Sequence, residues 1–316
     1  MQGKATIARN GLSRRQALAG GLCLCCMPTL GRADSFEIAE IAPGVFMRRG
    51  RDEEPNAANL DAIANIGFII GDDAVLVTDS GGSLADGQWL RKIIKEKTQK
   101  PIKYVVLSHV HLDHTFGAGA FLDDRPVFIG HAKLPEALEA RGEYYRKRLI
   151  GLLGEGKVGP VVMPTRTVAA GDQIDLGGRI ITFHAHGPAH TTSDFSMVDQ
   201  GSGFLLPADL LFVERIPALD GSLTGWLKEI DVLKAMNIPK AVPGHGPLTV
   251  DFKAASADLV RYLTLLRDGV RAEIKNNGSI EHAVLTVGQS EKSNWKLFDD
   301  YHARNVTEAY KELEWE

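Results

Sequence analysis

The sequence predicts a layered α/β fold in which helices cover two packed β-sheets. The chain has 316 residues, 44% of them apolar, which is enough to form a full core. Short apolar runs bounded by Gly, Pro and Asp alternate with longer segments of helical periodicity. The alternation is irregular, unlike the strict strand–helix repeat of a single parallel sheet, so we expect two mixed sheets.

The N-terminal region contains two predicted strand pairs. Phe36–Ile41 and Val45–Arg49 are apolar runs separated by a Pro-Gly turn. Ile66–Ile70 and Ala74–Thr78 form the second pair, and the Gly-Asp-Asp sequence between them is typical of a tight turn. These runs predict the first strands of one sheet.

The next segments alternate between helix and strand. Ser83–Thr98 has the apolar spacing of a helix, and a Lys-Pro pair ends it. Ile102–Ser108 and Pro126–Ile129 are predicted strands, the first of them buried. Leu134–Leu153 is predicted to be a helix with a basic and aromatic face.

The second half of the chain begins with strands, and residues 169–202 contain several of them. The clearest predicted strands are Arg179–His184, Asp194–Val198, Gly203–Leu206 and Ala241–Pro243. We expect Gly203–Leu206 to end at the Pro-Ala-Asp sequence that follows it. A helix is predicted at Gly221–Met236, and helical patterns fill most of the chain from about Asp251.

The sequence HVHLDH carries the strongest functional signal. It places His109, His111, Asp113 and His114 directly after a predicted strand. In an extended segment, residues two apart point to the same side, so His109 and His111 can reach one ion together. Asp113 and His114 follow a turn and can reach a neighbouring position. Histidine and carboxylate side chains are common ligands of divalent metals, so this sequence predicts a metal site.

Further His and Asp residues also follow the ends of predicted strands. They are Asp79, His190, Asp209 and His245. We expect all these segments to converge at one edge of the sheets.

HVHLDH, followed by Thr-Phe-Gly, resembles the H-x-H-x-D-H signature of the metallo-β-lactamase superfamily. Asp79 in VLVTDSG, His190 in HGPAHTTSD, Asp209 in LLPADLLF and His245 in AVPGHGP resemble further site residues of that family, in the same order. The resemblance implies a four-layer αββα sandwich of two mixed β-sheets flanked by helices.

The resemblance also implies roles for these residues. His109, His111 and His190 would hold one zinc ion. Asp113, His114 and His245 would hold a second, and Asp209 would bridge the two. Asp79 would bond a ligand imidazole and fix its tautomer.

Two Zn2+ ions are the expected cofactors, with iron or manganese less expected. The ions would share a hydroxide that attacks the substrate, and Asp113 would act catalytically by orienting it and moving a proton. The expected substrate is a small molecule with an ester, lactone, thioester, amide or similar bond.

The resemblance is compatible with several functions. The finer likeness is to exported zinc metallohydrolases associated with quinoprotein dehydrogenase systems, which implies a possible quinoprotein-system protein partner. The alternatives are a β-lactamase-type hydrolase with an all His/Asp site, a mononuclear iron dioxygenase of the same fold, and a metal-stabilised maturation factor without catalytic activity. β-Lactamases with a cysteine ligand are excluded, because all three cysteines lie before residue 27 in a predicted leader.

Residues 1–33 are predicted to be an export signal of the twin-arginine type. Arg14-Arg15 precedes a short apolar run, and Gly31-Arg32-Ala33 is a small-x-small cleavage site. We therefore expect a periplasmic or exported protein whose mature domain spans residues 34–316, with a core at about 36–248 and a helical part at 251–316. No apolar run in this mature part is long enough to predict a membrane span.

Loss of this leader makes the chain more acidic. It removes five basic and no acidic residues, which moves the formal net charge from −4 to −9. An acidic mature chain argues against a nucleic-acid partner.

Three further histidines and one basic segment lie outside the expected set of metal ligands. His184 and His186 lie close before His190, but the sequence around His190 favours the latter as the ligand. His131 follows a strand, and a structural role is expected for it. Arg141–Arg148, with the sequence RGEYYRKR, is predicted either to form a lid or anion-facing wall over the metals, or to be a solvated helix face.

Overall fold

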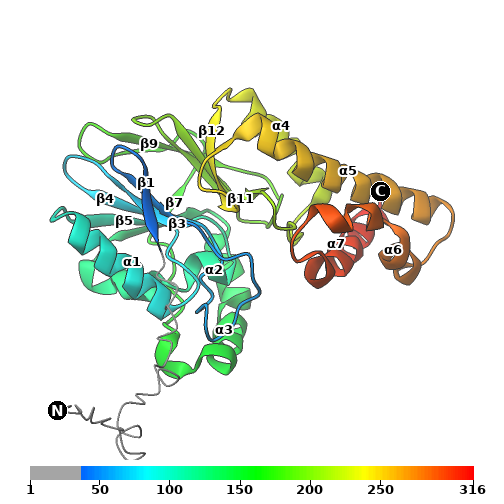
Figure 1. The fold of residues 1–316 in the computed structure, drawn as a ribbon, viewed down its shortest axis with the longest axis horizontal. Coiled ribbons are helices and arrows are strands. Elements are labelled where there is room, and N and C mark those ends of the chain that lie inside the picture. The colour runs from blue at the N-terminus through cyan, green and yellow to red at the C-terminus, as the bar shows by residue number, and fades with distance from the viewer. Residues whose placement is uncertain (1–36) are drawn as a thin grey trace, which may run out of the picture. The chain divides into compact units, whose positions relative to one another are not determined.

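Two β-sheets pack face to face in the computed structural model, which describes residues 37–316 (Figure 1). Their shared interior contains Leu76 and Val106 from one sheet and Phe183 and Leu206 from the other, all at most 5% exposed. The predicted export signal lies outside the described residues. In the part of the chain that is described, no helix has the length and hydropathy needed to cross a bilayer.

The first sheet has seven strands in sequence order. They are β1 (Ile38–Ala42), β2 (Val45–Arg48), β3 (Ile66–Ile70), β4 (Val75–Thr78), β5 (Ile102–Leu107), β6 (Val127–His131) and β7 (Arg166–Val168). Strands β1 to β4 are antiparallel neighbours, and β4 to β7 are parallel.

The second sheet has six strands in the order β13-β12-β11-β10-β9-β8. They are β8 (Gln173–Asp175), β9 (Ile180–Ala185), β10 (Phe195–Asp199), β11 (Phe204–Phe212), β12 (Lys240–His245) and β13 (Val250–Asp251). Strands β11 and β12 are parallel, and the other pairs are antiparallel. Both sheets are mixed, which confirms the predicted fold class.

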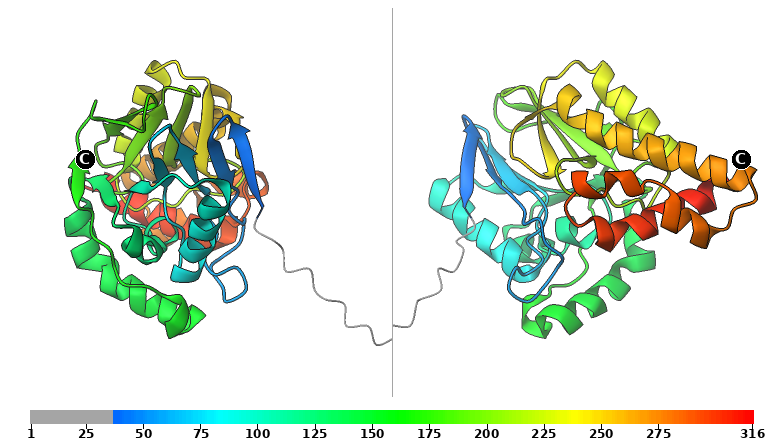
Figure 2. Two further views of the ribbon diagram at one scale, coloured as in Figure 1. Left: turned by 90° about the vertical axis from the view of Figure 1, so that its left-hand side faces the viewer. Right: turned by 45° about the vertical axis from the view of Figure 1, so that its right-hand side comes forward.

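Helices cover the outer faces of the two sheets (Figures 1 and 2). The α-helices are α1 (Leu84–Lys97), α2 (Leu112–Thr115), α3 (Leu134–Leu153), α4 (Leu223–Ala235), α5 (Phe252–Lys275), α6 (Ile280–Thr286) and α7 (Phe298–Leu313). Three short 3₁₀ segments lie at Ala118–Asp124, Glu155–Lys157 and Gln289–Asn294.

Separate apolar clusters join the helices to the sheets. Leu90 and Ile94 of α1 pack on the first sheet, and Trp226 of α4 packs on the second with Leu259 and Leu263 of α5. The Trp226 side chain is fully buried. The order of layers is therefore helix, sheet, sheet, helix.

Polar side chains fix the beginnings of the main helices. The Ser83 and Ser222 hydroxyls accept hydrogen bonds from backbone N–H groups at the start of α1 and α4, and Asp251 does the same for α5. The carboxylate of Glu312, on α7, also accepts the backbone N–H of Thr224 at 3.1 Å. The helical C-terminal part is thus bonded to the beginning of α4.

The predicted end of the Gly203–Leu206 strand is wrong. Strand β11 continues through the Pro-Ala-Asp sequence to Phe212, and its register with β12 shifts between Leu205 and Ala208. Ala208 adopts a φ of 48° at this irregularity. The bulge lets the strand pass a proline that has no N–H to donate, so Asp209 lies within a strand and not after one.

Strand β12 also continues beyond its predicted end. It extends through His245, which is its last residue. The short strands β7 and β13 are absent from the sequence prediction, because runs of two or three residues carry too little periodicity to be recognised.

Candidate metal centre

The HVHLDH segment forms the connection between β5 and α2. His109 follows the strand, His111 precedes the short helix, and Asp113 and His114 lie within it. The Thr115 hydroxyl donates to the His111 carbonyl at 3.0 Å. This turn separates the first pair of side chains from the second, as the sequence predicted.

The structure brings His109, His111, His190 and Asp209 together as the first group of candidate ligands. One donor atom from each lies within 4.8 Å of the others. His190 Nε2 is 2.9 Å from His111 Nδ1 and 3.3 Å from Asp209 Oδ2. His109 Nε2 is 3.7 Å from the same carboxylate oxygen.

Asp113, His114 and His245 form the second group, with the same 4.8 Å limit between donor atoms. Asp113 Oδ2 is 3.7 Å from His114 Nε2 and 3.3 Å from His245 Nε2. Asp209 Oδ2 is also 3.3 Å from His245 Nε2. The carboxylate of Asp209 therefore borders both groups.

Three buried atoms at this centre have no hydrogen-bond partner among residues 37–316. They are His109 Nε2, His114 Nε2 and Asp209 Oδ1. His114 Nε2 and Asp209 Oδ1 are only 3.0 Å apart, yet they form no hydrogen bond. Buried polar atoms without partners are costly, and divalent cations at the two groups would give all three atoms a partner. The donor set thus fits metal ions.

The other ring nitrogen of each imidazole is bonded to the protein. The contacts are His109 Nδ1 to Ser108 Oγ at 3.0 Å, His111 Nε2 to Asp220 Oδ2 at 3.0 Å, His114 Nδ1 to Asp79 Oδ2 at 2.8 Å, His190 Nδ1 to the Ala218 carbonyl at 2.6 Å, and His245 Nδ1 to the Ile63 carbonyl at 2.9 Å. Such bonds fix the tautomer and the ring orientation of a ligand histidine.

Asp79 lies where the sequence placed it, immediately after β4. It is 4% exposed and accepts two hydrogen bonds from Ser108, from the backbone N–H and from the hydroxyl, both at 2.8 Å. Its backbone adopts a φ of 60°, which an Asp tolerates better than most residues. Asp79 therefore holds the β5 end and the His114 ring together.

Asp220 was missed by the sequence analysis. It contacts His111, the guanidinium of Arg141 on α3, and Arg304 on α7 at 3.1 Å. Hydrogen bonds and charge from His111 and Arg141 hold the pKa of Asp220 below its ordinary value, although burial acts in the opposite direction. The only signal for Asp220 in the sequence is its position in the loop before the Gly221–Met236 helix, and its partners come from distant segments.

The electrostatic environment shifts the pKa values of the candidate ligands in both directions. Burial lowers the pKa of His109 well below its ordinary value. Burial alone would raise the pKa of Asp209, but the imidazoles of His114 and His245 hold it well below the usual range. The pKa of His114 is raised well above its ordinary value, because Asp209 and Asp113 outweigh the effect of burial. A metal ion at His114 must therefore displace a proton.

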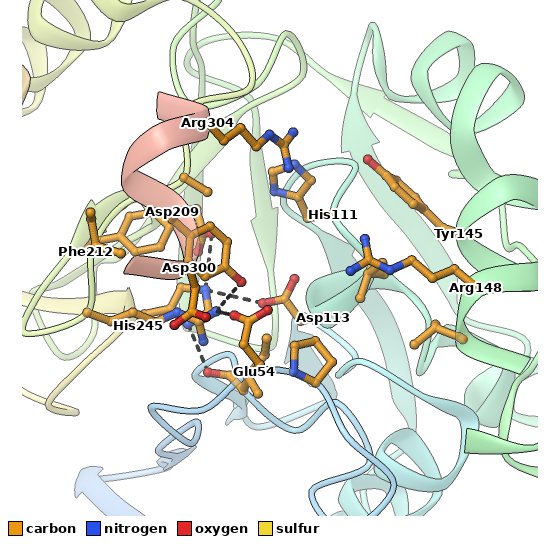
Figure 3. Close-up of a pocket in the computed structure, with 18 of the residues that line it drawn as sticks. Glu54, His111, Asp113, Tyr145, Arg148, Asp209, Phe212, His245, Asp300 and Arg304 are labelled. Atoms are coloured by element: carbon orange, nitrogen blue, oxygen red, sulfur yellow. Dashed lines mark hydrogen bonds and ion pairs between the residues drawn. The ribbon is translucent and has the colours of Figure 1, made fainter. Parts of the chain in front are cut away.

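A cavity of about 230 Å³ opens above these residues (Figure 3). His111, Asp113, Asp209 and His245 line its floor. Side chains of α3 and α7 form walls, with Arg148 on one side and Arg304 on the other. The centre is thus open to a small molecule on one side and enclosed by protein on the others.

His131, His184 and His186 belong to neither group of candidate ligands. His186 Nδ1 lies 2.9 Å from Glu229, and His186 Nε2 lies 2.8 Å from the Ser196 hydroxyl. His131 Nδ1 accepts the Lys133 N–H at 3.1 Å, which is a structural contact. His184 is half-buried on β9 and belongs to neither group of candidate ligands.

Two known proteins share sequence similarity with the chain. The alpha subunit of 2,4-dinitroanisole O-demethylase from Nocardioides sp. (strain JS1661) is 23% identical over 289 residues, which cover 86% of this chain and 82% of the relative. Hydroxyacylglutathione hydrolase from Idiomarina loihiensis is 26% identical over 143 residues, or 44% of this chain and 43% of the relative.

A solved structure and a family model identify the fold and the family. The sec-alkylsulfatase Pisa1 from Pseudomonas sp. superposes with a TM-score of 0.66 at 17% identity, covering 87% of this chain and 50% of the sulfatase. The family model described as the metallo-beta-lactamase superfamily matches residues 61–245, more than half of the chain. With this match, and with the fold and donor groups described above, the chain belongs to the metallo-beta-lactamase superfamily.

Proposed function

We propose that this protein is a hydrolase that uses two zinc ions. The observation that carries the proposal is the position of Asp209: its Oδ2 atom is 3.3 Å from Nε2 of His190 in the first group and 3.3 Å from Nε2 of His245 in the second. A carboxylate in this position suits a bridge between two ions. His109, His111 and His190 would hold one ion, and Asp113, His114 and His245 the other.

Bound zinc ions lower the pKa of water and polarise the bond that is cleaved. Asp113 would orient the attacking water and move its proton, since its carboxylate is at the cavity floor and is 8% exposed. The imidazoles of His114 and His245 hold the pKa of Asp113 below its usual value, although burial would raise it, so its carboxylate is ionised and can accept a hydrogen bond from water.

The side chains around the cavity support attack by water. Among the described residues, its lining contains no Ser, Thr or Cys, the side chains that most often act as covalent nucleophiles. We propose an ester, lactone, thioester, amide or similar bond as the target. The names of the similar proteins, a hydroxyacylglutathione hydrolase, an O-demethylase and an alkylsulfatase, support cleavage at a bond to oxygen or sulfur.

Metal analysis combined with a substrate panel tests this function. We expect about two zinc ions per chain at saturation and metal-dependent hydrolysis of at least one ester, lactone, thioester, β-lactam or sulfate ester. Asp209→Ala should lose both bound metal and activity. Iron alone, with oxygen consumption on a thiol substrate, would indicate a dioxygenase. Two zinc ions without hydrolysis of any substrate would favour the non-catalytic maturation factor.

We also propose export of the folded protein through the twin-arginine route, guided by residues 1–33. Replacing Arg14 and Arg15 with Lys should leave the full-length chain in the cytoplasmic fraction. Periplasmic protein in that variant would contradict this route. The association with a quinoprotein dehydrogenase system stays a prediction, which co-purification with such a dehydrogenase would test.

A further inference from the structure

The cavity over the candidate metal centre has two chemically different walls. Tyr145, Arg148, Leu149 and Leu152 of α3 form one wall. The other is formed mainly by α7, through Asp300, Tyr301 and Arg304. Figure 3 shows Arg148 and Tyr145 on the side of the cavity opposite Asp300 and His245. A molecule bound above the centre would therefore lie between the two helices.

Three guanidinium groups line this cavity, and two of them already have protein partners. Arg215 donates to the Tyr301 hydroxyl at 2.9 Å and lies 3.8 Å from Glu54. Arg304 donates to Asp220 at 3.1 Å. Within residues 37–316, Arg148 has neither a hydrogen bond nor an ion pair, although it lines the same cavity. It is the guanidinium that is available to a ligand.

The carboxylates that line the cavity make its two walls differ in charge. Asp300 lies across the cavity from Arg148, as does Glu54, whose charge Arg215 offsets in part (Figure 3). They repel an anionic group at that wall, while Arg148 attracts one at its own. A guanidinium also suits carboxylate, sulfate and phosphate groups, because its planar fork can donate two parallel hydrogen bonds.

The rest of the lining is apolar enough to hold a hydrocarbon body. Leu149 and Leu152 lie near Arg148 on α3. Phe212, at the end of β11, and Ile216, in the loop after it, also line the cavity. A fully hydrated small anion would leave these side chains without apolar contacts. The lining therefore favours a molecule that combines an apolar body with a charged end.

We propose that the substrate is an amphiphilic anion whose charged end binds Arg148 while its scissile bond lies over the metal centre. This inference rests on the proposed function, because it uses the same centre. Arg148 would then be a specificity-determining residue. Of the two roles predicted for the RGEYYRKR segment, this proposal favours the anion-facing wall.

Hydrolysis of matched esters is the first test. Metal-loaded wild-type protein is compared on the 4-nitrophenyl monoester of glutarate, which is anionic, and on neutral 4-nitrophenyl pentanoate. We expect Arg148→Gln to raise KM for the anionic ester by roughly 10- to 100-fold, with little change for the neutral ester. Lys147→Gln is the matched control, since Lys147 is exposed like its neighbour Arg148 but does not line the cavity.

Binding of an unreactive anion separates this inference from the proposed function. The probe is 4-phenylbutane-1-sulfonate, measured by calorimetry against wild type, Arg148→Gln and Lys147→Gln, with 4-phenylbutan-1-ol as the neutral reference. We expect the sulfonate to bind the wild type and the Lys147 variant alike, and at least about 10-fold more weakly to the Arg148 variant.

The outcomes of the two experiments differ in what they overturn. Sulfonate binding that depends on Arg148, without hydrolysis of these esters or of any substrate in the panel, would refute the hydrolase and leave the anion site in place. Hydrolysis that is indifferent to substrate charge and to Arg148 would overturn the anion site and leave the hydrolase. A preference for a cationic ester would also overturn the anion site, because it would assign recognition to Asp300 and Glu54.

Discussion

Single residues behind the candidate ligands determine how each imidazole faces the centre. Asp79 contacts His114 in the second group, and Asp220 contacts His111 in the first. The two carboxylates therefore support different halves of the centre. Their separate positions make it possible to weaken one predicted metal site without directly changing the other.

We expect Asp79→Asn to weaken metal binding at the second site, and Asp220→Asn at the first, each by about 10- to 100-fold. Chelator competition that resolves two affinities would measure this. Asp124→Asn is the matched control, because it makes the same change at an ion-paired Asp that is not among the candidate ligands or their partners. Asp124 pairs with Arg91 and Lys95 of α1. Equal loss of both metals in the Asp79 and Asp220 variants would contradict separate roles.

Gly244 allows β12 to approach Asp209 closely. A Cβ atom at this position would lie 1.9 Å from Asp209 Oδ1 and 2.8 Å from the Ala208 carbonyl carbon. Gly244→Ala should therefore displace the Asp209 carboxylate and reduce bound metal to fewer than two ions per chain, measured by elemental analysis. Gly151→Ala is the control, since a Cβ there would meet no atom within 4 Å. Full metal content in Gly244→Ala would show that Asp209 is not needed at its observed position.

At the scale of secondary-structure elements, the positions of the buried strands were more predictable than the residues at which they end. The apolar runs predicted β3, β4, β5 and α1 closely, because one face or both faces of each are buried. The continuation of β11 was not predictable, because a bulge with a positive φ at Ala208 carries the strand past a proline. Local sequence signals the proline but not the neighbouring strand that keeps the segment in the sheet.

A buried ion pair at the ends of β9 and β10 connects the second sheet to the first. Arg179 donates to Asp199 at 2.9 Å and to the Ile70 carbonyl at 3.0 Å. Asp199 is fully buried. Burial alone would raise its pKa, but hydrogen bonds from Arg179 and Ser202 hold it below the ordinary value.

We expect Asp199→Asn to lower the free energy of unfolding at pH 7 by on the order of 3 kcal/mol. The native pKa of Asp199 is depressed, so its stabilising effect is present above the unfolded pKa of about 3.9 and is lost as the pH falls through the native pKa. The difference between wild type and variant should therefore shrink below about pH 4. Urea unfolding at several pH values would measure it, and a difference independent of pH would refute the role of the charge.

For the molecule as a whole, the sequence predicted the centre better than the cavity. Most of the candidate ligands lie at or after the ends of strands, and strands of both sheets end at the same edge, so their convergence follows from the fold. Asp209, which lies within β11, is the exception. The cavity walls depend on how α3 and α7 lie across that edge, which no local pattern encodes. Helix α7 lies outside the matched residues 61–245, and it still contributes Tyr301 and Arg304 to the cavity lining.

Removal of metal should lower the stability of the whole molecule. The first group joins residues after β5 of one sheet to Asp209 of the other, so an ion there connects both sheets. Zinc at 100 times its dissociation constant would add about 2.7 kcal/mol to the free energy of unfolding. We expect the melting temperature to fall by several degrees on chelation and to recover with zinc. Asp209→Ala should show a smaller response, and an equal response would contradict this coupling.

The order of the candidate ligands along the chain has a consequence for synthesis. His109 leaves the ribosome early, whereas Asp209 and His245 follow only after most of the second sheet has been made. A nascent chain can therefore present part of the donor set but cannot complete it until β12 has been translated and has joined β11. Metal loading would then mark a late stage of chain maturation, and an unfinished or truncated chain would be recognisable to the cell as one that cannot retain the ions.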